Sequence, residues 1–516
     1  MTVQCERRMH VDDKLETQLD EASRVSAAKG PGFPFDEPGR AASDAPFAPA
    51  DEKYVQDLAR SLTFRENILI TLSAVTPASS VFIIMPSVIT GVGGAAAIAF
   101  VVAGLIGLVV AYCYAELSSA FPITGGEYAF VARTLGKPLG FALFGLTLVG
   151  GIFVLGVIAS GAGTYLGEIW GALNANWVGV VVILAVTVVA CFPIKANAWV
   201  TGVFLLIEIA ALVVLALLGF VHITQPISTL WQATAAGPGG VVMGASGGLV
   251  VSFIATALFA YNGYGTAVYY AEETKHARKT IGRAIMWSLL ITVCAELIPL
   301  IAILLGTPTM RGLLGAANPI SYFITERGGT VLNTIVSLGI AIAIINAVLA
   351  IILQLGRLLY SSARDRSWPE WINKPLASVH PKLRTPIVAT LVVGIAGALV
   401  FWLVPFDVLL IATGANLLVT YLLVGLAALV GRMNRSTHKA EYRMPWWPAT
   451  PIAMIVITLA VLLESILQAW IPVLVTVVIF AIGFPYYYFF IRPGRHDRWT
   501  LPEPADEELT DEVAGA

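Results

Sequence analysis

Charged side chains are scarce in this 516-residue chain. Lys, Arg, Asp and Glu together make up 12% of the residues, whereas hydrophobic residues make up 57%. The charged share is about half of that in a typical soluble domain. A soluble protein with this balance would have to leave large apolar surfaces in water. The composition therefore argues against a soluble globular protein and predicts an integral membrane protein.

Cysteine and histidine are also few. The four cysteines are Cys5, Cys113, Cys191 and Cys294, and three of them lie far apart in apolar runs without metal-site spacing. We expect free thiols rather than a structural disulfide, and neither a metal ion nor another cofactor. The six histidines all fall in tails or loops, so the clustered side chains that a membrane-embedded enzyme needs are missing. We therefore expect that the chain is not an enzyme.

Motifs for nucleotides and nucleic acids are absent as well. The chain contains no Gly-x-x-x-x-Gly-Lys-Ser/Thr sequence, which argues against ATP hydrolysis within it. It has a net charge of −2 and no long basic region, so nucleic acid is not an expected partner. Residues 1–60 are polar and lack the apolar core of a cleaved signal peptide, and residues 492–516 are acidic after Arg498. We expect both segments to be disordered cytoplasmic tails around a membrane domain at residues 61–491.

Long hydrophobic runs fill that domain. A helix needs about 20 apolar residues to cross the hydrocarbon layer of a membrane. The segments that meet this requirement are 67–92, 95–118, 139–166, 176–193, 197–221, 247–271, 284–306, 331–356, 386–404, 406–429, 450–467 and 471–491. The sequence therefore predicts an all-α integral membrane protein with twelve transmembrane helices.

Basic residues are concentrated in alternate loops. One set of loops contains Arg133, Lys137, Lys195, Lys275, Arg278, Lys279, Arg283, Arg357, Arg364, Arg366, Lys374, Lys382, Arg384, Arg432, Arg435, Lys439 and Arg443. The other set contains only Arg311 and Arg327. Because cytoplasmic loops carry the excess of Lys and Arg, both termini are expected in the cytoplasm. We predict a multi-pass protein of the cytoplasmic (plasma) membrane, with the lipid bilayer as its surroundings.

Two of the predicted spans are interrupted near their middle. The first span contains Thr76-Pro77-Ala78-Ser79-Ser80, where proline removes a helical hydrogen bond. The sixth span contains Tyr261-Asn262-Gly263-Tyr264-Gly265, where two glycines weaken the helix. Non-helical backbone at membrane depth persists only where protein or a watery cavity covers it. A matched pair of broken spans in the two halves of a chain indicates the substrate site of a transporter.

Three loop motifs then point to a known family. The first is Ala115-Glu116-Leu117 with Phe121-Pro122-Ile123-Thr124-Gly125-Gly126-Glu127-Tyr128, and the second is Ala271-Glu272-Glu273-Thr274 with Arg278-Lys279-Thr280-Ile281. The third is Gln354-Leu355-Gly356-Arg357-Leu358-Leu359-Tyr360-Ser361-Ser362-Ala363-Arg364-Asp365, followed by Val379-His380-Pro381-Lys382-Leu383-Arg384-Thr385-Pro386. As a set, over about residues 60–490, they resemble the amino acid/polyamine/organocation permeases.

The resemblance implies a five-plus-five inverted repeat, in which spans 1–5 and 6–10 fold alike in opposite orientations and two further helices follow. Independently of the resemblance, the motifs place acidic and basic residues together at predicted cytoplasmic helix ends, where ion pairs of Glu116, Glu272, Glu273 and Arg357 can open and close with a gate. The alternative is that these charges only set the topology and cap helix ends.

The resemblance further assigns the breaks to the substrate. Amino acid carriers of this family usually have Gly-Ser-Gly or Gly-Ala-Gly in the first break, where bare backbone N–H groups hold the substrate carboxylate. The segment Thr76, Pro77, Ala78, Ser79 and Ser80 departs from that pattern. The usual clamp is therefore in doubt, and an amine or another small solute stays open as the substrate.

The second break is similar to the family's Phe-Ala-Phe-x-Gly-Phe segment. On that basis Phe259, Ala260, Tyr261, Asn262 and Tyr264 are substrate-binding candidates, with Phe259 as the aromatic gate and backbone carbonyls facing a substrate ammonium. Aromatic rings also attract cations. The alternative is that these rings only pack against other helices or lipid.

Ionisable residues inside spans are functional candidates. Glu208 lies mid-span at the position where the resemblance implies a lysine in proton-coupled relatives. We hypothesise that Glu208 carries a coupling proton or pairs with a cationic substrate; the alternative is an acid hydrogen-bonded to a neighbouring helix. Glu296 and Glu464 are interpreted as packing or interfacial acids and Asp407 as an outer-surface acid. Asn346 and Asn416 either line the cavity or join helices.

These observations predict a secondary active transporter that moves an amino acid across the cytoplasmic membrane by alternating access, coupled to protons. The first alternative is a transporter or exchanger of a polyamine or another small amine. Outside the transporter class, the alternatives are a channel and a substrate sensor built on the same fold. The expected partners are the small-molecule substrate, protons and lipid.

Overall fold

The structure is a computed structural model that describes residues 62–123, 125–170, 175–192, 194–237, 242–383, 385–468, 470–494 and 498–499. The predicted N-terminal tail lies outside the described residues. So does the predicted C-terminal tail, apart from residues 492–494 and 498–499.

Helices make up most of the described chain. Their bounds are α2 Phe64–Val75, α3 Pro77–Ser79, η1 Ser80–Ile84, α4 Met85–Val92, α5 Ala96–Ala120, α6 Gly126–Thr134, α7 Lys137–Ile169, α8 Ala175–Ala190, α9 Ile194–Val221, η2 Ile227–Trp231, α10 Gly247–Ala260, η4 Tyr264–Glu273, α11 Ala277–Gly306, α12 Met310–Gly315, α13 Pro319–Arg364, α14 Glu370–Leu376, α15 Ile387–Leu403, α16 Phe406–Met433, α17 Ala449–Gln468, α18 Ile471–Tyr486, η5 Tyr487–Ile491 and η6 Arg492–Gly494. A short hairpin pairs β1 (Thr234–Ala236) with β2 (Val242–Gly244), with Thr234 opposite Gly244. The predicted all-α class is confirmed.

Ten helical segments of the described chain are long and apolar enough to cross a membrane, including the composite segments Phe64–Val92 and Gly247–Ala271. Two shorter apolar helices, Asn176–Ala190 and Ile387–Leu403, coincide with the predicted fourth and ninth spans. The chain is therefore a multi-pass helical membrane protein. The count of twelve spans and the five-plus-five repeat remain predictions.

The two shorter helices, α8 and α15, pack in opposite directions. At the start of α8, the ring of Trp177 lies 4.7 Å from that of Trp402 at the end of α15. Past the other end of α8, the Cys191 carbonyl accepts a 2.8 Å hydrogen bond from Thr385 Oγ1, which precedes α15. The two helices thus lie antiparallel.

The connections between helices gather at two ends of the bundle. At one, called the α6 end here, Asn434 Nδ2 donates to the Thr134 carbonyl at the end of α6, at 3.4 Å. At the other, called the hairpin end, the Ala95 amide donates to the Gln232 carbonyl beside β1, at 3.0 Å. Two of the loops that the sequence analysis identified as rich in Lys and Arg contact each other near the α6 end, where Arg278 Nη1 donates to the Lys439 carbonyl at 3.0 Å.

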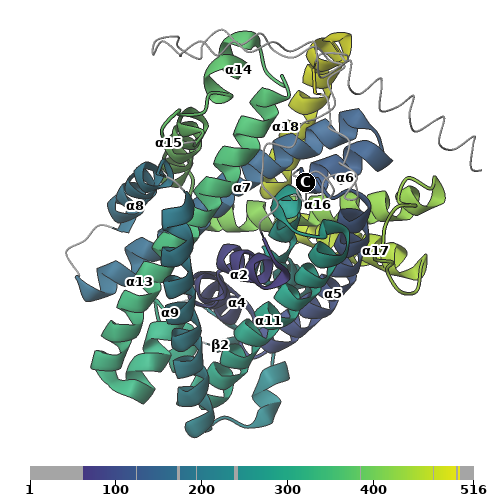
Figure 1. Cartoon of the computed structure of the whole chain (residues 1–516). Coiled ribbons are helices and arrows are strands. Elements are labelled where there is room, and N and C mark those ends of the chain that lie inside the picture. The colour runs from purple at the N-terminus through teal and green to yellow at the C-terminus, as the bar shows by residue number, and fades with distance from the viewer. Residues whose placement is uncertain are drawn as a thin grey trace, which may run out of the picture. The chain divides into compact units, whose positions relative to one another are not determined.

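The first span is broken where the sequence predicts. Helix α2 ends at Val75, and Thr76 adopts left-handed backbone angles (φ 47°, ψ 69°) before α3 begins at Pro77. Proline suits that first helical position because it has no N–H to leave unpaired. A π-helical turn, η1, then leads into α4. Figure 1 shows α2 and α4 in the middle of the helices drawn, and α2 packs against α9, α11 and α13.

The sixth span is broken in a different way. Helix α10 ends at Ala260, and the chain continues as a 3₁₀ helix, η4, from Tyr264. Between them Gly263 has φ 120°, a conformation that residues with side chains rarely adopt. A Cβ atom on Gly263 would lie 2.8 Å from the Val75 Cα. The two breaks therefore contact each other backbone to backbone.

We predict that Gly263→Ala destabilises the protein by more than about 1 kcal/mol, because alanine is strained at this φ and its methyl group collides with Val75. Gly247→Ala is the matched control, since a Cβ at Gly247 has open space around it. Thermal unfolding of the purified protein in detergent measures both. Equal melting temperatures for the two variants would contradict the backbone contact at the breaks.

Candidate functional site

A cavity of about 150 Å³ lies at the two breaks. Six of the predicted site residues line it: Thr76, Ser80, Phe259, Asn262, Tyr264 and Asn416. Helices α7, α13 and α16 supply further walls. The lining continues past the breaks to Tyr114 near the end of α5 and to Glu127 on α6, so the cavity extends towards the α6 end. The structure thus brings the two breaks together at one cavity.

The other predicted residues lie behind this wall. Pro77, Ala78, Ser79, Ala260 and Tyr261 are buried but are not among the residues that line the cavity. The ring of Tyr261 instead packs edge-on against Phe100, with centroids 5.4 Å apart. Their contribution to binding remains a prediction.

Ser80 joins the two breaks. Its Oγ donates a 2.7 Å hydrogen bond to the Ala260 carbonyl, which is 180 residues away in the sequence. That carbonyl belongs to the last turn of α10, where helical carbonyls lack partners. The bond therefore satisfies one group that the second break exposes, by means of a side chain from the first.

Glu208 lies on α9 with 1% of its surface exposed. Its carboxylate is beside the backbone N–H of Ala78 and the side-chain amide of Asn346 on α13, although neither carboxylate oxygen makes a hydrogen bond of normal geometry. Ala78 is the second residue of α3, so the carboxylate is at the N-terminal, positive end of the resumed helix. The sequence analysis predicted neither neighbour.

Asn416 lies at the cavity and also contacts a neighbouring helix. It lines the cavity, and its Oδ1 accepts a 2.5 Å hydrogen bond from Thr476 on α18. Asn346 is buried beside Glu208 rather than at the cavity wall.

Glu296 is closer to the breaks than the sequence indicates. It is fully buried on α11, and its carboxylate is beside the Ser80 hydroxyl and close to Tyr261. The sequence analysis interpreted it as a packing or interfacial acid. The only available signal was its position in the middle of an apolar helix, which it shares with Glu208.

Glu127 is a second residue that the sequence analysis did not select. It lies in the first turn of α6, and its two carboxylate oxygens accept hydrogen bonds from Tyr269 at 2.5 Å and from Tyr114 at 3.2 Å. Burial raises the pKa of the Glu127 carboxyl, and the two tyrosine hydrogen bonds oppose that shift. Glu127 is part of the quoted loop motif, but nothing in the motif indicates that its side chain reaches the cavity.

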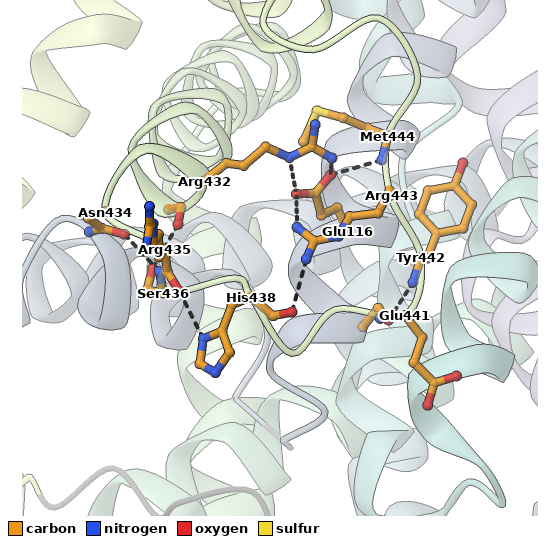
Figure 2. Close-up of polar contacts among 12 residues, drawn as sticks. Glu116, Arg432, Asn434, Arg435, Ser436, His438, Glu441, Tyr442, Arg443 and Met444 are labelled. Carbon is orange, nitrogen blue, oxygen red and sulfur yellow. Dashed lines mark hydrogen bonds and ion pairs between the residues drawn. The ribbon is translucent and has the colours of Figure 1, made fainter.

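An ion-pair cluster stands at the α6 end (Figure 2). Glu116, near the end of α5 and 1% exposed, accepts hydrogen bonds from Arg432 Nε at 2.9 Å and Nη2 at 2.6 Å. It also accepts one from the Met444 amide at 2.8 Å, and Arg443 lies 3.7 Å away. The guanidinium of Arg432 also lies 5.5 Å from the centre of the Trp447 ring. Glu116 therefore holds the end of α16 and the segment after it.

Ser119 completes this attachment. Its Oγ donates to the Arg278 carbonyl on α11 at 2.7 Å and accepts from the amides of Glu441 at 2.9 Å and Tyr442 at 3.0 Å. Burial raises the pKa of the Tyr442 hydroxyl to about 12. Residues 434–448, called the strap here, are thus fixed to α5 through Glu116 (Figure 2). They are also fixed to α11 through Arg278, whose Nη1 donates to the Lys439 carbonyl.

The predicted gate residues differ in whether they form ion pairs. Glu116 is paired, but with Arg432 and Arg443, which the sequence analysis did not name as its partners. Arg357 forms no ion pair among the described residues. The side chains of Glu272 and Glu273 lie outside the described parts of the chain. The gating role of these residues remains a prediction.

We predict that Glu116→Gln lowers the free energy of unfolding by about 2–4 kcal/mol, because it leaves Arg432 without its anion. The matched control is Glu441→Gln, which removes the exposed 3.5 Å pair with Lys279 and is expected to cost less than about 1 kcal/mol. Thermal unfolding in detergent compares them. A Glu116→Gln protein as stable as the control would show that the cluster does not hold the strap.

A helical membrane bundle with two broken spans around a cavity is the arrangement of a membrane transporter. A sequence model of the amino acid permease family matches residues 62–495. The chain belongs to this family.

Individual relatives agree with the family match. The methylthioribose transporter of Bacillus subtilis is 26% identical over 416 residues, which cover 77% of this chain and 86% of the relative. The branched-chain amino acid permease BcaP of the same organism is 26% identical over 431 residues, covering 78% and 88%. The cationic amino acid transporter 7 of Arabidopsis thaliana is 26% identical over 377 residues, covering 69% and 62%. These relatives are transporters rather than enzymes.

Proposed function

We propose that this protein is a secondary active transporter that moves an amino acid across the cytoplasmic membrane by alternating access. The observation that carries the proposal is the cavity at both helix breaks, where backbone groups released from helical hydrogen bonds are available to a ligand. The family match and the relatives named for amino acids support the choice of substrate class.

The packing at the hairpin end supports a carrier rather than a channel. A Cβ atom on Gly94 would lie 1.7 Å from the Thr229 carbonyl, so the turn after α4 packs directly against the connection between α9 and α10. Among the described residues, the cavity lining reaches Tyr114 and Glu127 at the α6 end, which the distribution of basic residues assigns to the cytoplasm. A site accessible from one side at a time is what alternating access requires.

Glu208 is the proposed carrier of the coupling proton. As an anion it is stabilised by the positive N-terminal end of α3, where a substrate carboxylate would also bind. Glu208 lies beside the Ala78 N–H behind the cavity wall, whereas Thr76 and Ser80 of the same break line the cavity. An ionised Glu208 and a substrate carboxylate at this break would therefore repel each other and share the field of one helix end. Protonation of Glu208 removes its negative charge from that helix end. Proton binding and binding of a substrate carboxylate therefore favour each other. Such positive coupling is the thermodynamic condition for symport.

We predict that Glu208→Gln abolishes proton-driven uptake while it preserves exchange of substrate across the membrane. Glutamine has the size of a protonated glutamate but carries no exchangeable proton, so the substrate site stays available and the coupling is lost. Uptake into proteoliposomes with and without an inward proton gradient measures coupling, and counterflow at equal pH measures exchange.

Glu296→Gln is the matched control, because it also removes a buried carboxylate beside the breaks. Proton-driven uptake in the Glu208→Gln protein would contradict the proposed carrier. Loss of the pH dependence in Glu296→Gln instead would assign coupling to the other acid.

A small amine is the second candidate substrate. The first break lacks the usual glycines, and Glu208 is already at the helix end that would hold a substrate carboxylate. Thermal stabilisation of the purified protein by amino acids and by the corresponding decarboxylated amines separates the two candidates, since a ligand of the folded state raises apparent stability. Stabilisation by amines alone would contradict the amino acid proposal.

A further inference from the structure

We propose that Glu127, with Tyr114 and Tyr269, forms a binding subsite for a positively charged group of the transported molecule, an ammonium or a guanidinium. The inference rests on the proposed transport function and adds a residue that selects among substrates. It depends on the chemistry of the cavity wall at the α6 end.

The first argument is the charge of the wall. Among the described residues that line the cavity, Glu127 is the one Asp or Glu, and Lys, Arg and His are absent. The other polar groups are hydroxyls, amides and backbone. A carboxylate in a partly desolvated cavity attracts a cation more strongly than it would in water and repels an anion. The wall is therefore biased towards positively charged solutes.

The second argument is the set of aromatic rings around the carboxylate. Tyr114, Tyr264, Tyr269 and Tyr421 all line the cavity. The rings of Tyr114 and Tyr421 meet edge to face with centroids 6.1 Å apart, and Tyr264 and Tyr421 share a 3.2 Å hydrogen bond between their hydroxyls. Aromatic rings attract cations through their negative faces. Rings beside a carboxylate suit an organic cation better than a neutral group.

The third argument is the unused capacity of Glu127. Tyr269 donates to one of its oxygens and Tyr114 to the other, which fixes the orientation of the carboxylate. An ionised carboxylate has about four lone-pair positions, so two donors leave room for a cation. A buried carboxylate without a positive partner is costly, and a bound cation would offset that cost.

The fourth argument is the position of Glu127 relative to the breaks. A Cβ atom on Gly265 would lie 3.8 Å from Glu127 Oε1 and 3.0 Å from the Tyr114 ring. Gly265 follows Gly263 by only two residues, about 4 Å along a 3₁₀ helix. A small molecule held at the breaks therefore needs only a short chain to bring a charged group to Glu127.

The test compares lysine with norleucine, which has the same carbon chain without the terminal ammonium, and with cadaverine, which lacks the carboxylate. Apparent affinities are measured from ligand-dependent thermal unfolding of the purified full-length protein. We expect lysine to bind about tenfold or more tightly than norleucine, the range of one charge-assisted hydrogen bond. Glu127→Gln should remove this advantage and leave norleucine binding within about twofold.

Two further variants keep the test decisive. Glu127→Asp retains the charge and should retain part of the preference for lysine. Glu326→Gln removes an exposed carboxylate at the hairpin end and should change neither affinity. Norleucine binding by Glu127→Gln confirms that this variant is folded; if that variant does not fold, reversal of the preference in Glu127→Asp overturns the subsite.

The outcomes separate the subsite from the transport proposal. Equal binding of lysine and norleucine by the wild-type protein would overturn the subsite and leave amino acid transport intact. A lysine preference that persists in Glu127→Gln would do the same. Binding of cadaverine but not of either amino acid, lost in Glu127→Gln, would support the subsite and overturn the amino acid substrate. Absence of binding by all three compounds would overturn the subsite, whereas the amino acid proposal is judged by the wider comparison of amino acids and amines.

Discussion

The structure depends on keeping two helices interrupted inside the membrane. Each interruption releases backbone N–H and C=O groups that lipid cannot satisfy, so the surrounding protein must supply partners or a polar cavity. The Ser80 hydroxyl meets this requirement directly by donating to the Ala260 carbonyl, and the close approach of Gly263 to Val75 packs the two breaks against each other. Both contacts join one break to the other. The two interruptions therefore stabilise each other, and the cavity between them persists as a result.

At the α6 end, a buried charge likewise requires partners, and the strap supplies some of them. Glu116 is almost fully buried, and a buried carboxylate is tolerated only with paired charge and hydrogen bonds. Arg432 supplies a two-point pair, and the Met444 amide adds a third donor. Arg432 lies in the last turn of α16, and Glu116 lies near the end of α5. The ion pair that compensates for burying Glu116 therefore joins two helices that line the cavity. An ionic contact far from the breaks thus constrains the shape of the site.

The sequence was sufficient for the fold class, the location of both breaks and most helix bounds, because composition, proline and glycine act locally. It was insufficient for neighbours across the bundle. Nothing in the order of residues indicates that Glu208 meets Ala78 and Asn346, that Glu296 lies beside Ser80, or that Arg432 pairs with Glu116 across 316 positions. Glu127 was quoted within a loop motif and still missed, because a loop residue reaches the cavity only through the fold of α6 against η4.

Three acids lie around the breaks: Glu208, Glu296 and Glu127. They differ in the positive or hydrogen-bond-donating groups that lie beside each carboxylate. Glu208 has the N-terminal end of α3, Glu296 has only neighbouring hydroxyl groups, and Glu127 has tyrosine hydroxyls together with access to the cavity. A carboxylate that stays desolvated can be stabilised by a helix dipole, a proton or a mobile cation. Glu208 and Glu296 are not among the described residues that line the cavity, so a helix end or a proton is the partner open to them. Glu127 alone of the three faces the space that a solute enters, so it is the acid whose partner can be the solute itself.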